Sequence, residues 1–469
     1  MLGQLGVFYL NQNKDIVIIG CGASGGTAAQ FARKTDRKSS ITIFEKGKYP
    51  QYSKCGLPYA ISGDVKNLED LIEFSDGWFK KANIDLLLNT TVEKIDANNQ
   101  IIIAKKDNVS IEKSYSSLII ATGAKPSVPP IKNIFEDNKL AKGVFVLRTI
   151  SDAKQISSNI QKGKNVIVIG AGFIGLEMAD TLYKKYMKVT VIEALPWVLP
   201  NTFDEDMAAV VFESFPKDVN VFTGNIVTKI ESKSGKISKV FLKNNKTNEE
   251  KELPTDMLVI GAGCKPDSIL AQKAGCNLGK VGHIVVNNKC ETSVKNIYAV
   301  GDCTQYKDFV TKKPVPIGLG SIAVRQGITA GINAAGGNYF LPDGVIQSCT
   351  SEFFKIEVAA VGPSTDNLKE LSVVTGKFTG YSRAEYFPGG NKITIKVFAD
   401  EKTGKIVAAQ AVGDKAAKRI NTFACAILNG MDVETFKKLE TTYAPPIAPT
   451  LDVETLVCDI VSMKLNRKR

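Results

Sequence analysis

The chain has 469 residues, of which 44% are apolar and 23% are charged, and this composition excludes disordered and fibrous proteins. Its net charge of +12 comes from scattered lysines, without the basic run or aromatic–basic alternation of a nucleic-acid groove. The longest apolar runs are strand-sized, far below the roughly 20 residues of a membrane-spanning helix. Neither nucleic acid nor a membrane is therefore an expected partner.

Cysteine and histidine usage narrows the chemistry further. The nine cysteines form no C-x-x-C pair or zinc-type cluster, which predicts a reducing compartment and no metal site. Residues 1–13 lack the basic start and small-residue cleavage site of a signal peptide. We interpret them as a short extension before the first strand and expect a cytoplasmic protein. His283 is the only histidine, which argues against Ser-His, Cys-His and multi-histidine metal chemistry.

The first predicted unit is a strand, a glycine turn and a helix. Residues 15–19 form a β-branched strand, G-C-G-A-S-G-G follows at 20–26, and 27–34 is a helical stretch. Glycines at this turn let the backbone approach a pyrophosphate, while the helix N-terminus faces the negative charge. The expected dinucleotide contacts are Gly20, Gly22, Ser24 and Gly25. A second strand, 41–44, ends in Glu45, whose carboxylate would accept hydrogen bonds from an adenosine ribose.

Cys55 stands alone in the segment Y-S-K-C-G-L-P-Y, which begins at Tyr52. No second cysteine lies near enough in the sequence to close a local disulfide, so a redox cycle through Cys55 needs a redox partner from outside this segment. The thiolate is the reactive form, and an apolar pocket alone would raise the pKa of the thiol. Lys54 and a helix starting at 56–58 are candidates to stabilise the thiolate, although Lys54 fits a solvated surface position equally well.

Two apolar strands each end in a small-residue turn. The first, at 117–120, leads into Ala121, Thr122 and Gly123, and the second, at 257–260, leads into Gly261. Both turns are consistent with backbone that passes close to a cofactor. A third apolar run, 297–300, ends at Asp302, where a strand's carboxyl end would gather ligands; the spacing alone also allows a helix N-cap.

The dinucleotide pattern returns in the middle of the chain. Residues 165–169 form a strand, G-A-G-F-I-G follows at 170–175, and a strand at 189–192 ends in Glu193. The expected contacts are Gly170, Gly172, Ile174 and Gly175. Two complete patterns predict two dinucleotides. Glu193 would repel a 2′-phosphate and no arginine or lysine lies beside it, so NADH is favoured over NADPH.

These elements, in this order, resemble the two-dinucleotide flavoprotein disulfide reductase superfamily over essentially the whole chain. The resemblance implies an α/β fold with two Rossmann-like dinucleotide-binding domains, for FAD and NAD, and a C-terminal α+β dimerisation domain. It assigns 1–149 and 281–346 to the FAD-binding domain, 150–280 to the NAD(P)-binding domain and 347–469 to dimerisation. It also implies FAD contacts from the first glycine turn, Lys46, Val92, the 121–123 turn and Asp302.

Within this superfamily, 53–59 resembles the S-x-x-C-[GA]-x-P-Y-like segment of the single-cysteine branch, offset because Gln51 and Tyr52 occupy the usual places of the serine. The branch contains NADH oxidases and peroxidases, coenzyme A disulfide reductases and sulfur reductases. The second cysteine and C-terminal His-Glu pair of glutathione-reductase-type enzymes are missing, as is the glycine-loop histidine usual in peroxidases. Coenzyme A disulfide reductases use tyrosines of the partner subunit, and the resemblance carries these over to Tyr386 and Tyr443.

The resemblance thus implies a homodimeric, FAD-dependent enzyme that reduces coenzyme A disulfide with NADH or NADPH, through a mixed disulfide between Cys55 and coenzyme A. Thr27, Lys34 and Lys54 would bind the coenzyme A substrate, with Lys80 or Lys81 nearby. Two alternatives stay open. In the first, the same fold passes electrons to oxygen, peroxide or polysulfide. In the second, an electron-transfer flavoprotein serves a protein partner and Cys55 is a bystander.

Overall fold

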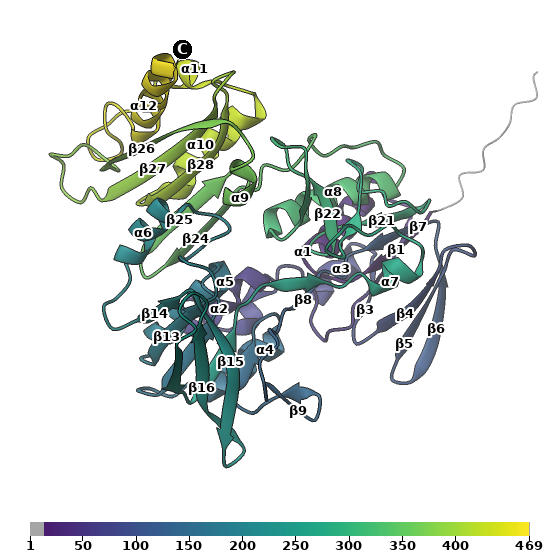
Figure 1. Ribbon diagram of the computed structural model, residues 1–469. Helices are drawn as coiled ribbons and strands as arrows, with labels where there is room; N and C mark the ends of the chain where they lie inside the picture. The colour runs from purple at the N-terminus through teal and green to yellow at the C-terminus, as the bar shows by residue number, and fades with distance from the viewer. Residues whose placement is uncertain (1–13, 469) are drawn as a thin grey trace, which may run out of the picture.

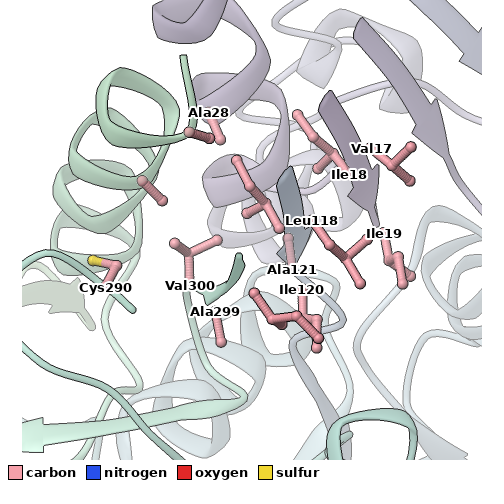
Figure 2. Packing of buried hydrophobic residues seen from close by; sticks show 14 of the residues in the cluster. Val17, Ile18, Ile19, Ala28, Leu118, Ile120, Ala121, Cys290, Ala299 and Val300 are labelled. Carbon is pink, nitrogen blue, oxygen red and sulfur yellow. The ribbon is translucent and has the colours of Figure 1, made fainter. Parts of the chain in front are cut away.

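The computed structural model describes residues 14–468, so the predicted extension at 1–13 lies outside the described residues. The first layer is a parallel sheet of five strands in the order β21-β7-β1-β2-β3. These strands span Asp15–Ile19 (β1), Ser40–Phe44 (β2), Asp85–Leu87 (β3), Ser117–Ile120 (β7) and Ile297–Ala299 (β21). Val17 and Ile18 point to opposite faces of β1 and both are fully buried, so both faces of the sheet are covered (Figure 2).

Two helices pack closely against this sheet and against each other. α1 (Ala23–Thr35) lies along α8 (Gly320–Ala334), and α8 returns to the first sheet from the segment predicted as the second part of the FAD-binding domain. A Cβ on Gly327 or Gly331 would overlap the backbone of α1, so these glycines set the short distance between the helices. The helix predicted at 27–34 in fact begins at Ala23. The prediction was wrong there because Gly25 lies inside the helix, where its missing Cβ allows close packing.

The second layer repeats the first. Its five parallel strands run in the order β11-β18-β12-β13-β14. They span Val144–Val146 (β11), Asn165–Ile169 (β12), Lys188–Glu193 (β13), Asn220–Thr223 (β14) and Met257–Ile260 (β18), with helices α4 (Ile150–Asn159), α5 (Phe173–Lys184) and α6 (Glu205–Glu213). Because β11 pairs with β18, this sheet begins a few residues before position 150, where the NAD(P)-binding domain was predicted to start.

Smaller sheets extend and join the two layers. Three-stranded antiparallel sheets are formed by β4 (Thr91–Asp96), β5 (Ile101–Lys106) and β6 (Val109–Ser114), and by β15 (Asn225–Lys233), β16 (Lys236–Asn244) and β17 (Glu250–Pro254). β8 (Ala124–Pro126) follows β7, β19 (Cys264–Pro266) follows β18, and these two pair antiparallel. This pair brings the carboxyl ends of the two parallel sheets together.

The C-terminal part is an antiparallel sheet of five strands with helices packed on it, at the top of Figure 1. It consists of β24 (Cys349–Phe353), β25 (Ile356–Val361), β26 (Val373–Tyr381), β27 (Lys392–Asp400), β28 (Ile406–Gly413), α10 (Ala416–Leu428) and α12 (Val453–Lys468). Lys396 of β27 reaches the second layer, where its Nζ lies 2.6 Å from Asp204 and 2.7 Å from Asp206. The predicted class, two α/β units followed by an α+β domain, is confirmed.

Within residues 14–468, none of the helices combines the length and apolar character needed to cross a bilayer. The same residues contain no group of three His, Cys, Asp or Glu side chains arranged to hold a metal ion. His283 lies just before β20 (Ile284–Val285) and is buried, which lowers the pKa of its imidazole. Burial therefore favours the neutral form of the single histidine.

Glu454, in the first turn of α12, is a buried carboxyl group whose protonation is expected to control stability. It is 6% exposed, and burial together with the neighbouring charge of Asp452 raises its pKa from 4.5 to about 7. Between these two pH values the folded protein keeps a proton that the unfolded chain has lost, so the free energy of unfolding falls as pH rises through this window and is level above it. We predict a fall of about 3 kcal/mol, from the size of the shift.

Glu454→Gln should remove this fall, because its side chain is uncharged at every pH. Urea unfolding at several pH values across the window measures the effect. Glu213→Gln, a change at the exposed end of α6, should keep the wild-type pH dependence. A wild-type stability curve that rises with pH through the window would contradict the prediction.

Candidate functional site

One large cavity, of about 2050 Å³, lies where the carboxyl ends of the two parallel sheets meet. Ligands of open α/β sheets bind at this edge. Cys55 and Lys54 line the cavity together with most of the predicted cofactor contacts, which are Gly20, Gly22, Ser24, Glu45, Lys46, Val92, Ala121, Thr122, Gly123, Gly170, Gly172, Ile174, Glu193, Gly261 and Asp302. The structure thus brings both nucleotide turns and the lone cysteine to one place.

The first glycine turn has a shape that only glycine allows. Gly20 has a φ of +101°, and a Cβ there would overlap the carbonyl oxygen of Ala121. Gly25 packs under the turn, because a Cβ at this position would overlap the Gly20 carbonyl. Gly25 therefore supports the turn without lining the cavity, and Gly20 and Gly22 leave open backbone above it.

Glu45 closes the outer side of this turn. Its Oε2 accepts a hydrogen bond from the N–H of Cys21 at 2.7 Å, and its Oε1 accepts one from the N–H of Gly47 at 2.6 Å. The two bonds fix the carboxylate at the end of β2, on the cavity wall. This is the position at which the sequence predicts a carboxylate for the adenosine ribose.

The second turn repeats this geometry. Gly170 has a φ of +99°, and Gly175 packs beneath it as Gly25 packs beneath Gly20. Glu193 Oε2 accepts from the N–H of Ala171 at 2.7 Å, and its Oε1 accepts from the N–H of Leu195 at 2.8 Å. One geometry, built twice from different segments, supports two dinucleotide subsites.

Glu193 is expected to set the preference for NADH. Its carboxylate is only 8% exposed and is held by two backbone N–H groups, so it cannot turn away from a 2′-phosphate. We predict that the double change Glu193→Ser and Leu195→Arg shifts the NADPH/NADH ratio of kcat/KM by roughly 10- to 100-fold, the equivalent of one charged hydrogen bond. Steady-state kinetics with both nucleotides measures the ratio. Leu195→Ala alone should keep the NADH preference; a ratio that stays constant in the double variant would contradict the assignment.

Asp302 lies in the turn after β21 and does not cap a helix. Its Oδ2 accepts a hydrogen bond from Nη2 of Arg148 at 2.6 Å, and both side chains are 19% exposed. Nε of Arg148 is buried without a hydrogen-bond partner in the described part of the chain. Arg148 also lines the cavity, so it brings a positive charge to the cavity wall.

Gln326 of α8 holds the backbone just before Asp302. It is fully buried, and its Oε1 accepts hydrogen bonds from the N–H of Gly301 at 2.8 Å and from the Thr304 hydroxyl at 3.1 Å. Neither Arg148 nor Gln326 was predicted as a site residue. Neither lies in a glycine turn or beside the acidic end of a strand, so no local pattern indicates its role.

Cys55 lies in a 3₁₀ turn, Lys54–Gly56, that leads directly into α2 (Leu57–Ser62). A helix therefore does begin after the cysteine, with Pro58 in its first turn. A Cβ built on Gly320, the first residue of α8, would lie 3.9 Å from the Cys55 sulfur. The thiol is exposed to the cavity and lies beside the start of that helix.

The protein surroundings raise the pKa of the Cys55 thiol. The largest cause is desolvation by the protein on its other sides, followed by the charges of Glu177 and Asp302. Arg148 and Lys54 act in the opposite direction but do not outweigh these effects. A thiolate at this position consequently needs a further stabilising group.

Lys54 is not a solvated surface residue. Its Nζ lies 4.0 Å from the point that a Cβ on Gly22 would occupy, so the amine lies over the first glycine turn. Burial, followed by the neighbouring charge of Arg148, lowers the pKa of Lys54 to about 8. The Lys54 amine is thus close to the first glycine turn and also acts on the Cys55 thiol through its charge.

Tyr386 and Tyr443 come together from two separate loops. Tyr386 lies between β26 and β27, Tyr443 lies before α12, and their hydroxyl oxygens are 3.2 Å apart. They are 75% and 48% exposed. Neither is among the described residues that line the cavity, so within one chain the two hydroxyls lie away from the cavity that holds Cys55.

The structure places the predicted substrate contacts in different parts of the molecule. Lys54 lies on the cavity wall, but Thr27 is buried in the contact between α1 and α8 and does not line the cavity. Lys34 is exposed in the last turn of α1. Lys80 and Lys81 are exposed at the end of α3 (Asp76–Lys81). Of these residues, only Lys54 lines the same cavity as Cys55.

The fold and the cavity define an oxidoreductase with two dinucleotide sites and the Cys55 thiol beside them, in a cavity that Cys349 and Cys425 also line. The family described as pyridine nucleotide-disulphide oxidoreductase matches residues 14–327, and its dimerisation domain matches residues 348–454. The chain belongs to the pyridine nucleotide-disulphide oxidoreductase family. It is therefore an enzyme and a flavoprotein, and the predicted family and fold class are confirmed.

Individual relatives carry three different names. The chain is 38% identical to an NADH oxidase of Methanocaldococcus jannaschii, over 96% of this chain and 99% of the relative. It is 28% identical to a coenzyme A disulfide reductase of Staphylococcus aureus, over 94% and 98% of the two chains. A solved NAD-dependent persulfide reductase from A. fulgidus superposes with a TM-score of 0.91 at 35% identity, covering 97% of this chain and 84% of that one.

Proposed function

We propose that this protein is a homodimeric, FAD-dependent enzyme that reduces coenzyme A disulfide with NADH. The observation that carries the proposal is the exposed Cys55 thiol beside two nucleotide turns, in a chain whose nine cysteines are all free. The exposed hydroxyl pair of Tyr386 and Tyr443 adds a proton donor that the single histidine, buried elsewhere, does not supply. The name of the S. aureus relative supports the same substrate.

The residues of the first turn fit FAD. Gly20 and Gly22 present open backbone to a pyrophosphate, and Lys54 and Arg148 bring positive charge beside it. Glu45 would accept hydrogen bonds from the adenosine ribose, and Asp302 would contact the ribityl chain. Bound FAD supplies the route by which an electron pair passes from NADH to sulfur.

The sulfur chemistry is disulfide exchange at Cys55. Its thiolate attacks one sulfur of coenzyme A disulfide, forms a Cys55–coenzyme A disulfide and releases the first coenzyme A thiolate. An electron pair that originates from NADH breaks this mixed disulfide, which restores the Cys55 thiolate and releases the second coenzyme A thiolate. The net reaction converts one disulfide, NADH and a proton into two thiols and NAD⁺.

The tyrosine pair would protonate the leaving thiolates. In a pair of hydrogen-bonded hydroxyls one O–H is used between the two oxygens, so the other stays free to donate to sulfur. The hydrogen bond from Tyr386 lowers the pKa of Tyr443, while the same contact raises the pKa of Tyr386. Tyr443 is thus the stronger acid of the two and the better candidate for the proton donor.

Mass spectrometry of the Cys55 peptide tests the proposal. Trypsin cleaves after Lys54 and Lys66, so digestion without reductant isolates the peptide 55–66. We expect the mass of a coenzyme A adduct, which dithiothreitol removes. A free thiol or oxidised sulfur, together with rapid oxygen consumption in the presence of NADH, would contradict the proposal.

Reduction of polysulfide, persulfide or oxygen is the second candidate. The relatives named persulfide reductase and NADH oxidase favour it, because an exposed cysteine can also cycle through a persulfide or a sulfenic acid. NADH oxidation rates with coenzyme A disulfide, polysulfide and oxygen, at matched concentrations, separate the two candidates. The acceptor with the highest kcat/KM identifies the function.

A further inference from the structure

The tyrosine pair depends on two loops that are separate in the sequence. Ser382 and Asn391 close the base of the Tyr386 loop. The N–H of Ser382 donates to the carbonyl oxygen of Asn391 at 2.9 Å, and the N–H of Asn391 donates to Ser382 Oγ at 3.3 Å. The Tyr443 loop ends at Asp452, immediately before α12. Two exposed loops keep a hydroxyl–hydroxyl distance of 3.2 Å only if both are fixed to the same body.

Arg419, in the first turn of α10, contacts the base of both loops. Its Nε and Nη2 donate to the two carboxylate oxygens of Asp452, at 2.7 and 2.8 Å. Nη2 also lies 3.4 Å from the carbonyl oxygen of Ser382, and Nη1 lies 3.4 Å from that of Asp414. The Arg419 and Asp452 side chains are 7% and 8% exposed, so this fork is shielded from water.

Two neighbouring contacts attach the same loops to the start of α10. Ser382 Oγ donates to Asp414 Oδ2 at 2.6 Å. Lys415 Nζ donates to the carbonyl oxygen of Ile447, inside the Tyr443 loop, at 3.1 Å. Asp414 and Lys415, just before α10, therefore each attach one of the two loops to the helix that carries Arg419.

We propose that Arg419 is the positioning residue of the Tyr386–Tyr443 pair. It links the Ser382 end of one loop to the Asp452 end of the other and so sets the distance between the two hydroxyls. This inference rests on the proposed function in one respect only, the use of the pair as proton donor. Arg419 itself touches neither substrate nor cofactor. A lysine cannot replace it, because an ammonium group lacks the planar fork that reaches two carboxylate oxygens and a carbonyl together.

The first test is a tyrosine titration that does not depend on activity. The ultraviolet phenolate titration of the holoenzyme, minus that of Tyr386→Phe/Tyr443→Phe, isolates this pair from the other tyrosines. We expect two separated transitions in the wild type and their convergence in Arg419→Lys, because the hydroxyls move apart. Arg33→Lys, which alters an arginine bonded to backbone carbonyls of another domain, should titrate as the wild type does. An unchanged difference curve in Arg419→Lys overturns the proposal.

The second test is kinetic. Arg419→Lys should lower turnover with coenzyme A disulfide by about 100-fold, the effect of a misplaced catalytic group, and should cause no further loss in the Tyr386→Phe/Tyr443→Phe background. An additional loss in that background overturns the positioning role. If the tyrosine changes alone leave turnover intact, the proposed function of the pair fails, whereas the titration still reports whether Arg419 holds it.

A second variant tests the proposal if Arg419→Lys does not fold. Arg419→Met combined with Asp452→Leu replaces the buried ion pair with apolar side chains, a change that is often neutral or stabilising. It still removes the link to the Ser382 carbonyl. The same convergence of the two tyrosine transitions is expected, and circular dichroism checks the fold.

Discussion

Cys55→Ser is expected to abolish reduction of coenzyme A disulfide, with a loss of at least about 1000-fold in turnover, because a serine hydroxyl cannot form the mixed disulfide. The variant should still bind FAD, since the glycine turns, Glu45 and Arg148 are unchanged. It should also still bleach the flavin when NADH is added. Steady-state assays with coenzyme A disulfide and stopped-flow absorbance of the flavin measure the two halves of the reaction separately.

The control for this change is Cys264→Ser. Cys264 is also an exposed cysteine, but it lies on β19 and not among the described residues that line the cavity. Its loss should leave both half-reactions at the wild-type level. If Cys55→Ser oxidises NADH with every acceptor as fast as the wild type does, the sulfur mechanism is wrong and the electron-transfer alternative gains support.

The nucleotide sites could be predicted because their signals are local. Gly20, Gly25 and Glu45 lie within one strand–turn–helix–strand unit, and each has a role that its residue type alone indicates. The same holds for Gly170 and Glu193. The start of α1 was misplaced because glycine has two uses: in a turn it allows unusual backbone angles, and inside a helix it allows close packing.

The contacts that complete the site come from distant parts of the sequence. Arg148 and Asp302 are 154 residues apart, and Gln326 meets Gly301 only because α8 packs against the first sheet. No periodicity or spacing indicates such pairs. Thr27 shows the converse: the resemblance assigned it to substrate, yet its face of α1 is buried against α8.

Tyr443→Phe is expected to lower turnover with coenzyme A disulfide by roughly 100-fold or more, the usual effect of removing a general acid. Tyr386→Phe should have a smaller effect, because Tyr386 acts through the hydrogen bond that lowers the pKa of Tyr443. The double change should cost little more than Tyr443→Phe, since the two hydroxyls act as a unit. Tyr186→Phe, an exposed tyrosine of the second layer, is the matched control and should keep full turnover.

A mixed dimer decides whether the tyrosines act on the partner subunit's cysteine. In a heterodimer of one Cys55→Ser chain and one Tyr386→Phe/Tyr443→Phe chain, sharing across the interface leaves one site with both an intact cysteine and intact tyrosines. Such a heterodimer should recover about half of the wild-type turnover, although the tyrosine parent homodimer keeps only about 1% of it and the Cys55→Ser parent less still. If cysteine and tyrosines of the same chain worked together, both sites of the heterodimer would be defective and no activity would return. Recovery of activity would also explain why the hydroxyl pair, 3.2 Å apart and exposed in one chain, lies away from the cavity of that chain.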